Sequence, residues 1–189
     1  MLTGYIDGYC CNKIFSYDYI VKNKFKFKPG VYFEDFFPVF KQVYKSEKIG
    51  FYNKVIYNYR QREESISNSK NKKLLDDFKA NVKDVLNYIE VNNIVFPEEC
   101  IQSYKIQGFN FMVTIFYELN KDNKNLYKNF YNDDYSLYEV SFIDVLKNKH
   151  VKIKTKVSVL LWKLRLYGMG IDTLRSIQSI IKFRFRFDL

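Results

Sequence analysis

Residues that hold metals or form disulfides are scarce in this sequence. The 189 residues include one histidine, His150, and three cysteines. Cys10 and Cys11 are adjacent and Cys100 stands alone, so the usual spacing of metal ligands is absent. An odd number of cysteines, two of them neighbours, is typical of a protein kept in a reducing compartment. We therefore expect no metal site, no cofactor held by this chain and a cytoplasmic location.

Long apolar runs are also absent. No stretch of about 18 consecutive apolar residues occurs, so no helix is expected to cross a bilayer. The start at Met1, MLTGY, lacks the basic and apolar regions of a signal peptide, and none is predicted. Hydrophobic residues nevertheless make up 47% of the chain, with 17 tyrosines and 18 phenylalanines. This composition indicates a globular protein with a sizeable core.

Positive charge is unevenly distributed. The net charge is +10, and residues 151–189 hold nine Lys or Arg against two Asp, a local charge of +7. The basic residues are Lys152, Lys154, Lys156, Lys163, Arg165, Arg175, Lys182, Arg184 and Arg186. Without a nucleic-acid-binding motif, this charge predicts no nucleic acid but an anionic membrane surface as partner. Trp162 and the phenylalanines of residues 182–187 would then seat among the headgroups. A core helix over residues 157–167 with solvated basic residues is the alternative.

Apolar residues recur at helical spacing in the second half of the chain. The first predicted helix carries the stripe Leu74, Phe78, Val82, Val85 and Ile89. The second is expected to open at Pro97 and to carry Phe109, Met112, Val113, Phe116 and Leu119. A third is predicted over Leu137–Lys149. Residues 151–157 and 182–187 alternate in character, which allows a short strand at 151–157 and a strand or an extended tail at 182–187.

The first third of the chain mixes helix and strand signals. A short helix is expected over Tyr17–Lys22. Phe25 and Phe27 alternate with lysines and predict a short edge strand. A longer helix should start at Asp35, a preferred N-cap residue, and Ile49–Arg60 alternates as a strand does. The predicted fold class is α+β and mostly helical, with boundaries at 1–69, 70–150 and 151–189.

Two segments gather acidic, basic and hydroxyl side chains. Glu34 and Asp35 precede the predicted helix, where acidic residues commonly stabilise the helix end without any chemistry. Arg60, Arg62 and Ser65 lie in a polar turn, which is commonly only solvated. A carboxylate can also act as a general base, and arginines can hold a diphosphate. The residues by themselves leave both interpretations open.

The order of these segments resembles a known family. Residues 8–15, GYCCNKIF, and 25–67, FKFKPGVYFEDFFPVFKQVYKSEKIGFYNKVIYNYRQREESIS, are similar to the second half of the catalytic domain of family 2 glycosyltransferases. The likeness is to the bacterial capsule and cell-surface polysaccharide branch, which has a GT-A fold. It covers Gly4 to about Ser69, just over a third of the chain. The resemblance implies a partial GT-A-like α/β remnant followed by a helical region.

The resemblance also assigns roles to residues. It implies that Asp35 is the base that deprotonates the acceptor sugar hydroxyl, with Glu34 as the supporting residue. Arg62 and Ser65, with Arg60 beside them, would bind the donor diphosphate. Asn12 and Lys13 match a segment near the acceptor, although Cys11 stands where the family has an aromatic residue. For Lys13, an ordinary exposed lysine is the alternative.

The family's nucleotide-binding half is missing from this sequence. That half carries the Asp-x-Asp motif, which holds Mg²⁺ or Mn²⁺ on the nucleotide-sugar, and nothing before Gly4 supplies it. Asp133-Asp134 is interpreted as a solvated loop or helix cap. We therefore expect a glycosyltransferase-like protein that is inactive alone and whose missing half would act in trans. A non-catalytic membrane-surface or assembly protein at the inner face of the cell membrane is the alternative, and a nucleic-acid binder ranks last.

Overall fold

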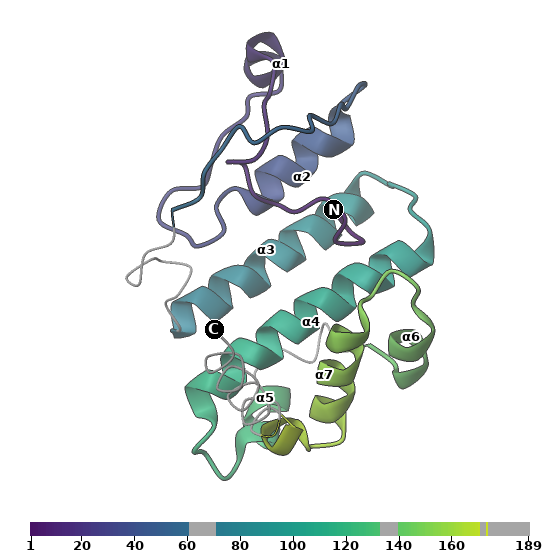
Figure 1. The fold of residues 1–189 in the computed structure, drawn as a ribbon. Helices are drawn as coiled ribbons and strands as arrows, with labels where there is room; N and C mark the ends of the chain where they lie inside the picture. Colours follow the sequence, from purple (N-terminus) through teal and green to yellow (C-terminus); the bar gives the residue numbers. More distant parts are fainter. Residues whose placement is uncertain (61–70, 133–139, 171–172, 174–189) are drawn as a thin grey trace, which may run out of the picture. The chain divides into compact units, whose positions relative to one another are not determined.

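The computed structural model describes residues 1–60, 71–132, 140–170 and 173. These residues form helices and loops, without a β-strand among them (Figure 1). The helices are α1 (Tyr17–Lys22), α2 (Phe36–Lys45), α3 (Lys72–Val91), α4 (Glu98–Asn120), α5 (Leu126–Asn132), α6 (Phe142–Lys147) and α7 (Ile153–Lys163). The predicted helical character is confirmed. The chain forms two compact units, residues 1–101 and 102–189.

The first unit is built on the packing of α2 against α3. Asn71 caps α3, because its side chain accepts a hydrogen bond from the Leu74 N–H at 2.7 Å. The predicted apolar stripe of α3 is confirmed, with Leu74, Val82, Val85 and Ile89 buried. From α2, the rings of Phe37, Phe40 and Tyr44 surround Tyr88 of α3 at centroid distances of 5.8–6.4 Å. These aromatic contacts fix the start of α2, where the predicted acidic pair lies.

The second unit has an aromatic core. Phe130 of α5 lies 5.6 Å from Phe109 and 5.2 Å from Phe116, both on α4, and 4.8 Å from Trp162 of α7. All four side chains are at most 4% exposed. The helix expected from Pro97 is therefore confirmed as α4. The helix predicted over 137–149 is observed at Phe142–Lys147, and residues 133–139 lie outside the described part of the chain.

Both strand predictions for the first third of the chain are wrong. Residues 49–60 are exposed throughout and adopt no strand, and Phe25 and Phe27 lie in a loop. A strand needs a neighbour to satisfy its backbone N–H and C=O groups, and none of the described segments pairs with either stretch. The phenylalanines instead make ring contacts, Phe15–Phe25 at 5.3 Å and Phe25–Phe27 at 5.0 Å. The side chains of Phe15, Phe25 and Phe27 thus form an aromatic cluster.

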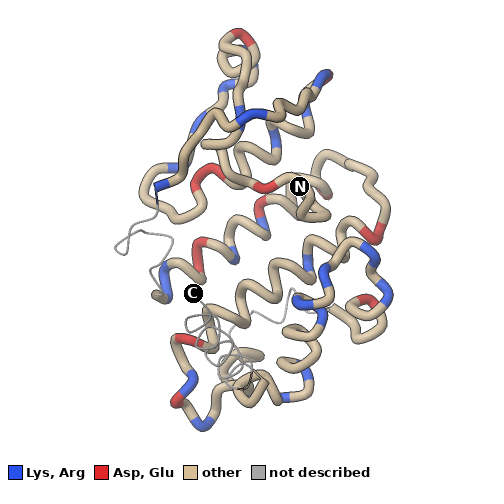
Figure 2. Tube along the Cα trace, viewed as in Figure 1, with Lys and Arg blue, Asp and Glu red and all other residues tan. Residues whose placement is uncertain are grey.

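The basic C-terminal part begins with a helix. The short strand considered at residues 151–157 is wrong, because α7 starts at Ile153. Trp162 is completely buried, so it is a core residue and not a headgroup anchor. The core-helix interpretation of this segment therefore holds for Trp162. Figure 2 marks basic residues along α7 and at its ends, and of these Lys152, Lys154 and Arg165 are exposed. Residues 182–187 lie outside the described residues.

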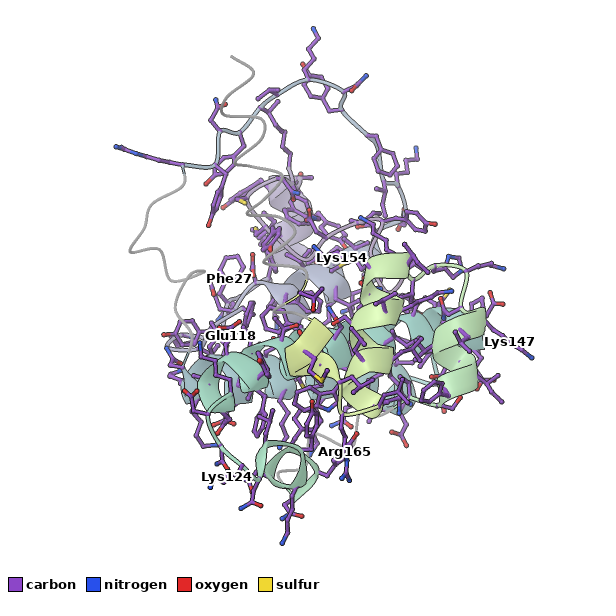
Figure 3. All side chains as sticks on the ribbon, turned by 60° about the horizontal axis from the view of Figure 1, so that its bottom comes forward. Phe27, Glu118, Lys124, Lys147, Lys154 and Arg165 are labelled. Carbon is purple, nitrogen blue, oxygen red and sulfur yellow. The ribbon has the colours of Figure 1, made fainter. Side chains whose placement is uncertain are left out.

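Exposed basic and apolar side chains remain at both ends of α7. Lys154 near its start and Arg165 just after its end are exposed (Figure 3). Ile153 is 75% exposed and Leu164 is 55% exposed. Within the described ranges, no helix has both the length and the apolar character required to cross a bilayer.

Candidate functional site

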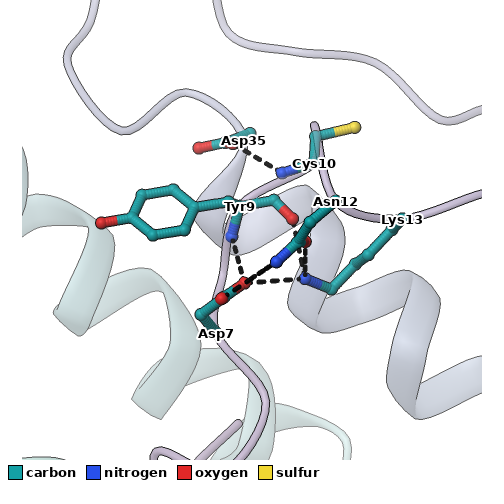
Figure 4. Close-up of polar contacts among 6 residues, drawn as sticks. All are labelled: Asp7, Tyr9, Cys10, Asn12, Lys13 and Asp35. Atoms are coloured by element: carbon teal, nitrogen blue, oxygen red, sulfur yellow. Dashed lines mark hydrogen bonds and ion pairs between the residues drawn. The ribbon is translucent and has the colours of Figure 1, made fainter. Parts of the chain in front are cut away.

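Asp7 accepts hydrogen bonds from several residues of the loop 7–13, which contains the predicted acceptor-binding residues Asn12 and Lys13 (Figure 4). Its carboxylate accepts hydrogen bonds from the Asn12 amide, at 3.0 Å to each oxygen, and from the Lys13 ammonium at 3.0 Å. The Tyr9 N–H is a further donor at 3.3 Å. Burial alone would raise the pKa of Asp7. The hydrogen bonds from Lys13, Asn12 and Tyr9, together with the charge of Lys13, outweigh the effect of burial and lower the pKa. The carboxylate therefore stays ionised and ties the loop together.

Lys13 is an internal part of this loop. Its side chain is 14% exposed, so the alternative of an ordinary exposed lysine is wrong. Besides Asp7, the ammonium donates to the Tyr9 carbonyl at 2.7 Å and to the Asn12 side-chain oxygen at 2.8 Å. These three acceptors use the three protons that a lysine offers. In this conformation Asn12 and Lys13 shape the loop and have little capacity left to hold a ligand directly.

Asp35 lies directly against this loop. One of its carboxylate oxygens, Oδ2, accepts a hydrogen bond from the Cys10 N–H at 2.9 Å. Gly8 allows the close approach, because a Cβ atom there would lie 2.2 Å from a ring carbon of Phe36, the first residue of α2. The structure thus brings together the predicted base and the predicted acceptor segment.

Asp35 occupies the N-cap position of α2 without capping it. The sequence predicts that Asp35 caps this helix, but its side chain accepts no capping hydrogen bond from the first turn of α2. Its backbone is already helical, with φ −87° and ψ −25°, whereas a capping residue is extended. The carboxylate is therefore directed to Cys10, and its other oxygen, Oδ1, accepts no hydrogen bond from the described part of the chain.

A strained turn at Phe33 comes immediately before Glu34 and Asp35. Phe33 has φ +59°, in the left-handed region that bulky residues rarely adopt. Its ring packs 5.3 Å from the ring of Phe78 on α3, which stabilises this conformation. After the turn, Asp35 is half-buried and bonded to Cys10, while Glu34 is exposed and lines a separate cleft. The two adjacent carboxylates therefore face different parts of the first unit.

Two other groups of the loop titrate above their usual ranges. Burial, with a further contribution from the Asp35 charge, raises the pKa of the Cys10 thiol. Burial also raises the pKa of the Tyr9 phenol, with smaller contributions from Asp7, Tyr59 and Asp35. Both groups are therefore protonated near neutral pH. Cys10 therefore lacks the thiolate that a nucleophile or a metal ligand needs.

The predicted diphosphate-binding residues are not brought to this loop by the described structure. Arg60 is exposed at the end of the irregular segment 49–60, and Arg62 and Ser65 lie outside the described residues. Asp133-Asp134 also lies outside them. The part of the chain that is described contains no group of three or more His, Cys, Asp or Glu side chains that could hold a metal ion.

A cleft of about 380 Å³ lies in the first unit and was not predicted from the sequence. Residues 24–28 form one wall, and α2 and α3 form the others. Glu34 and Lys41 lie on it, and the buried Gln42 reaches it from α2. The alternation of lysine with phenylalanine in residues 24–28, which predicts an edge strand, instead belongs to a loop that lines this cleft.

Comparison with protein-family models, curated proteins and solved structures finds no match to this chain. The function therefore has to be inferred from its residues and their geometry. The two features available for that inference are the Asp35 carboxylate with the loop that holds it, and the cleft lined by Glu34.

Proposed function

We propose that this chain is the acceptor-side part of a family 2, GT-A type glycosyltransferase that acts in bacterial surface polysaccharide synthesis. One observation carries the proposal. The Asp35 carboxylate is held by the Cys10 N–H through Oδ2, is not used as a helix cap, and keeps Oδ1 open. A residue that only stabilised α2 would direct its oxygens to the first turn of that helix.

The proposed chemistry is general base catalysis. A sugar hydroxyl is a weak nucleophile at neutral pH and needs a carboxylate to accept its proton as the new glycosidic bond forms. Asp35 Oδ1 takes this proton. The hydrogen bond from Cys10 fixes the direction of the carboxylate, and the positive end of the α2 dipole favours its negative charge. Glu34 acts beside it, and Asn12 and Lys13 act by holding the loop.

The donor has to be bound largely by other residues. In this proposal Arg62 and Ser65, with Arg60, contact the diphosphate, and a separate nucleotide-binding half supplies the divalent metal that assists departure of the nucleotide. The chain alone therefore has no transferase activity. The missing half is its partner in trans.

An assay of sugar transfer tests the proposal. The chain is incubated with a panel of nucleotide-sugars and with Mn²⁺ or Mg²⁺, alone and together with a separately expressed nucleotide-binding half of a family 2 transferase. We expect turnover only in the mixture. Asp35→Asn should lower it by about 10²–10⁴-fold, the usual contribution of a general base.

Asp122→Asn is the matched control, because Asp122 is exposed in the loop after α4 and should leave turnover unchanged. Turnover that survives Asp35→Asn would refute the role of Asp35. Turnover by the chain alone, lost in Asp35→Asn, would refute the need for a second half.

A non-catalytic role at the membrane surface is the second candidate. The specific observation is the exposed Ile153 between the exposed Lys152 and Lys154 at the start of α7. Exposed basic and apolar side chains together are what a peripheral contact with anionic lipid requires. The two roles are compatible, since a surface-polysaccharide transferase has to meet its acceptor. We therefore propose a cytoplasmic location at the inner face of the membrane.

A further inference from the structure

Gln42, one of the residues that line the cleft of the first unit, carries a buried acceptor without a donor. Gln42 is 2% exposed and lines the cleft, and its side-chain oxygen Oε1 has no hydrogen-bond partner among the described residues. Its backbone carbonyl, in contrast, accepts bonds from the Tyr19 hydroxyl and the Ser46 hydroxyl, both at 2.7 Å. Buried polar atoms are almost always paired, so an unpaired one that reaches a cleft indicates a missing donor. A ligand hydroxyl would be such a donor.

The charges of the cleft favour an anion. Lys24 and Lys26 are exposed on its rim and have no bonded partner in the ranges that the structure describes. Of its carboxylates, Asp77 is already occupied by the Lys73 ammonium and by the Tyr32 N–H at 2.8 Å. The lining therefore has four ammonium groups, those of Lys24, Lys26, Lys28 and Lys41. Against them stand two carboxylates that are not already bonded, those of Glu34 and Asp84.

The rim also has an aromatic surface. Phe27 is 47% exposed, and its ring packs edge-on against Phe25 at 5.0 Å, so one part of the ring stays available. Phe37 of α2 contributes a second ring beneath the Lys41 ammonium, 5.3 Å from its centroid. Apolar surface with a few convergent polar groups is the usual composition of a ligand site. Rings of this kind suit the C–H faces of a sugar.

We propose that the cleft binds an acidic saccharide, whose hydroxyl donates to Gln42 Oε1 and whose carboxylate or phosphate contacts Lys24 and Lys26. In the proposed function the cleft is a subsite for the acceptor glycan, because Glu34, the residue proposed to support Asp35, lines it. This role in transfer rests on the function proposed above. The binding itself does not, and it can be measured without any reaction.

Isothermal titration of the full chain with three probes tests the proposal. An oligogalacturonate has both hydroxyls and charge, its methyl ester keeps the hydroxyls without the charge, and inorganic triphosphate has charge without sugar hydroxyls. We expect the oligogalacturonate to bind at least about tenfold more tightly than either of the others, because one well-placed polar contact accounts for about that factor. Equal affinities for triphosphate and oligogalacturonate would overturn the proposal, since the lysines would then be a general anion surface.

Two variants locate the site. Gln42→Leu keeps the volume and removes the unpaired oxygen, so it should weaken oligogalacturonate binding by about tenfold and raise the Tm. Lys26→Gln should weaken binding by a similar factor, whereas Lys48→Gln, an exposed lysine outside the cleft, should not. Unchanged binding in Gln42→Leu with a folded protein would overturn the site. Asp35→Asn should retain binding, so loss of transfer and loss of the subsite are distinguishable.

Discussion

Asp35 and Cys10 are joined by a hydrogen bond of 2.9 Å although 25 residues separate them in sequence. The bond connects the start of α2 to the loop that Asp7 organises. Its strength can be tested independently of any activity.

Asp35→Ala should expose the Cys10 amide. The variant removes a charged acceptor from a half-buried N–H, which we expect to lower the free energy of unfolding by about 1–3 kcal/mol. Hydrogen exchange of the Cys10 amide should become faster, while exchange in α3 should change much less. Asp122→Ala serves as the control, and equal exchange of Cys10 in both variants would show that the bond is not formed in solution.

Acid should destabilise the first unit through Asp7. Because its pKa is lowered in the folded state, the stabilisation is complete above the ordinary carboxylate pKa and is lost as the pH falls through the folded value. We expect the free energy of unfolding to fall below about pH 4. Asp77, whose pKa is lowered despite burial by its bonds with Lys73 and Tyr32, contributes in the same range.

Asp7→Asn should make this pH dependence shallower, because the Asn side chain has no carboxylate that takes up a proton as the pH falls. Asp18→Asn, an exposed aspartate in α1, should leave the slope as it is. Urea unfolding at a series of pH values measures both. An unaltered slope in Asp7→Asn would show that the loop charges do not couple to folding.

Phe130→Ala should be severely destabilising. The side chain is completely buried and contacts the rings of Phe109, Phe116 and Trp162, so its removal leaves a cavity. The expected loss is about 3–5 kcal/mol. Phe142→Ala on α6, where the ring is 42% exposed, should cost under about 1 kcal/mol. Urea unfolding followed by circular dichroism compares them, and similar losses would contradict the core described for the second unit.

Removal of the C-terminal residues should weaken binding of the chain to anionic membranes. A chain ending at Gly170 retains α7 with its buried Trp162 and lacks Arg175, Lys182, Arg184 and Arg186. Each basic residue near an anionic surface contributes about 1 kcal/mol, so sedimentation with phosphatidylglycerol vesicles should fall at least about tenfold. Lys124→Gln in the exposed loop before α5 is the control. Equal partitioning of the shortened and full chains would rule this contact out.

The helices were predictable because their signals are local. The stripe of Leu74, Val82, Val85 and Ile89 requires only that one face of α3 be covered, and any partner satisfies it. Strands require a particular neighbour, and the alternation of residues 49–60 carries no information on whether one exists. The strand expectations therefore failed where the helix expectations succeeded.

The contacts of the candidate site could not be predicted from the sequence. Asp35 was singled out by its position before an apolar helix, yet the pattern favoured a cap, because nothing local shows that its own backbone is helical. The partners of Lys13 depend on a loop that folds back on Asp7, which spacing does not reveal. Gln42 carried no signal at all, since a lone polar residue on an apolar helix is ordinarily solvated.

Trp162 has a consequence for measurement. It is the one tryptophan of the sequence, it is completely buried, and its ring neighbours Phe116, Tyr127, Phe130 and Tyr167 all belong to the second unit. Emission excited at the red edge of its absorption therefore originates in that unit only, while the amide signal of the far ultraviolet sums over both. Recording the two during one denaturation would resolve the unit that carries Asp35 from the unit that does not, with a chromophore already in the chain.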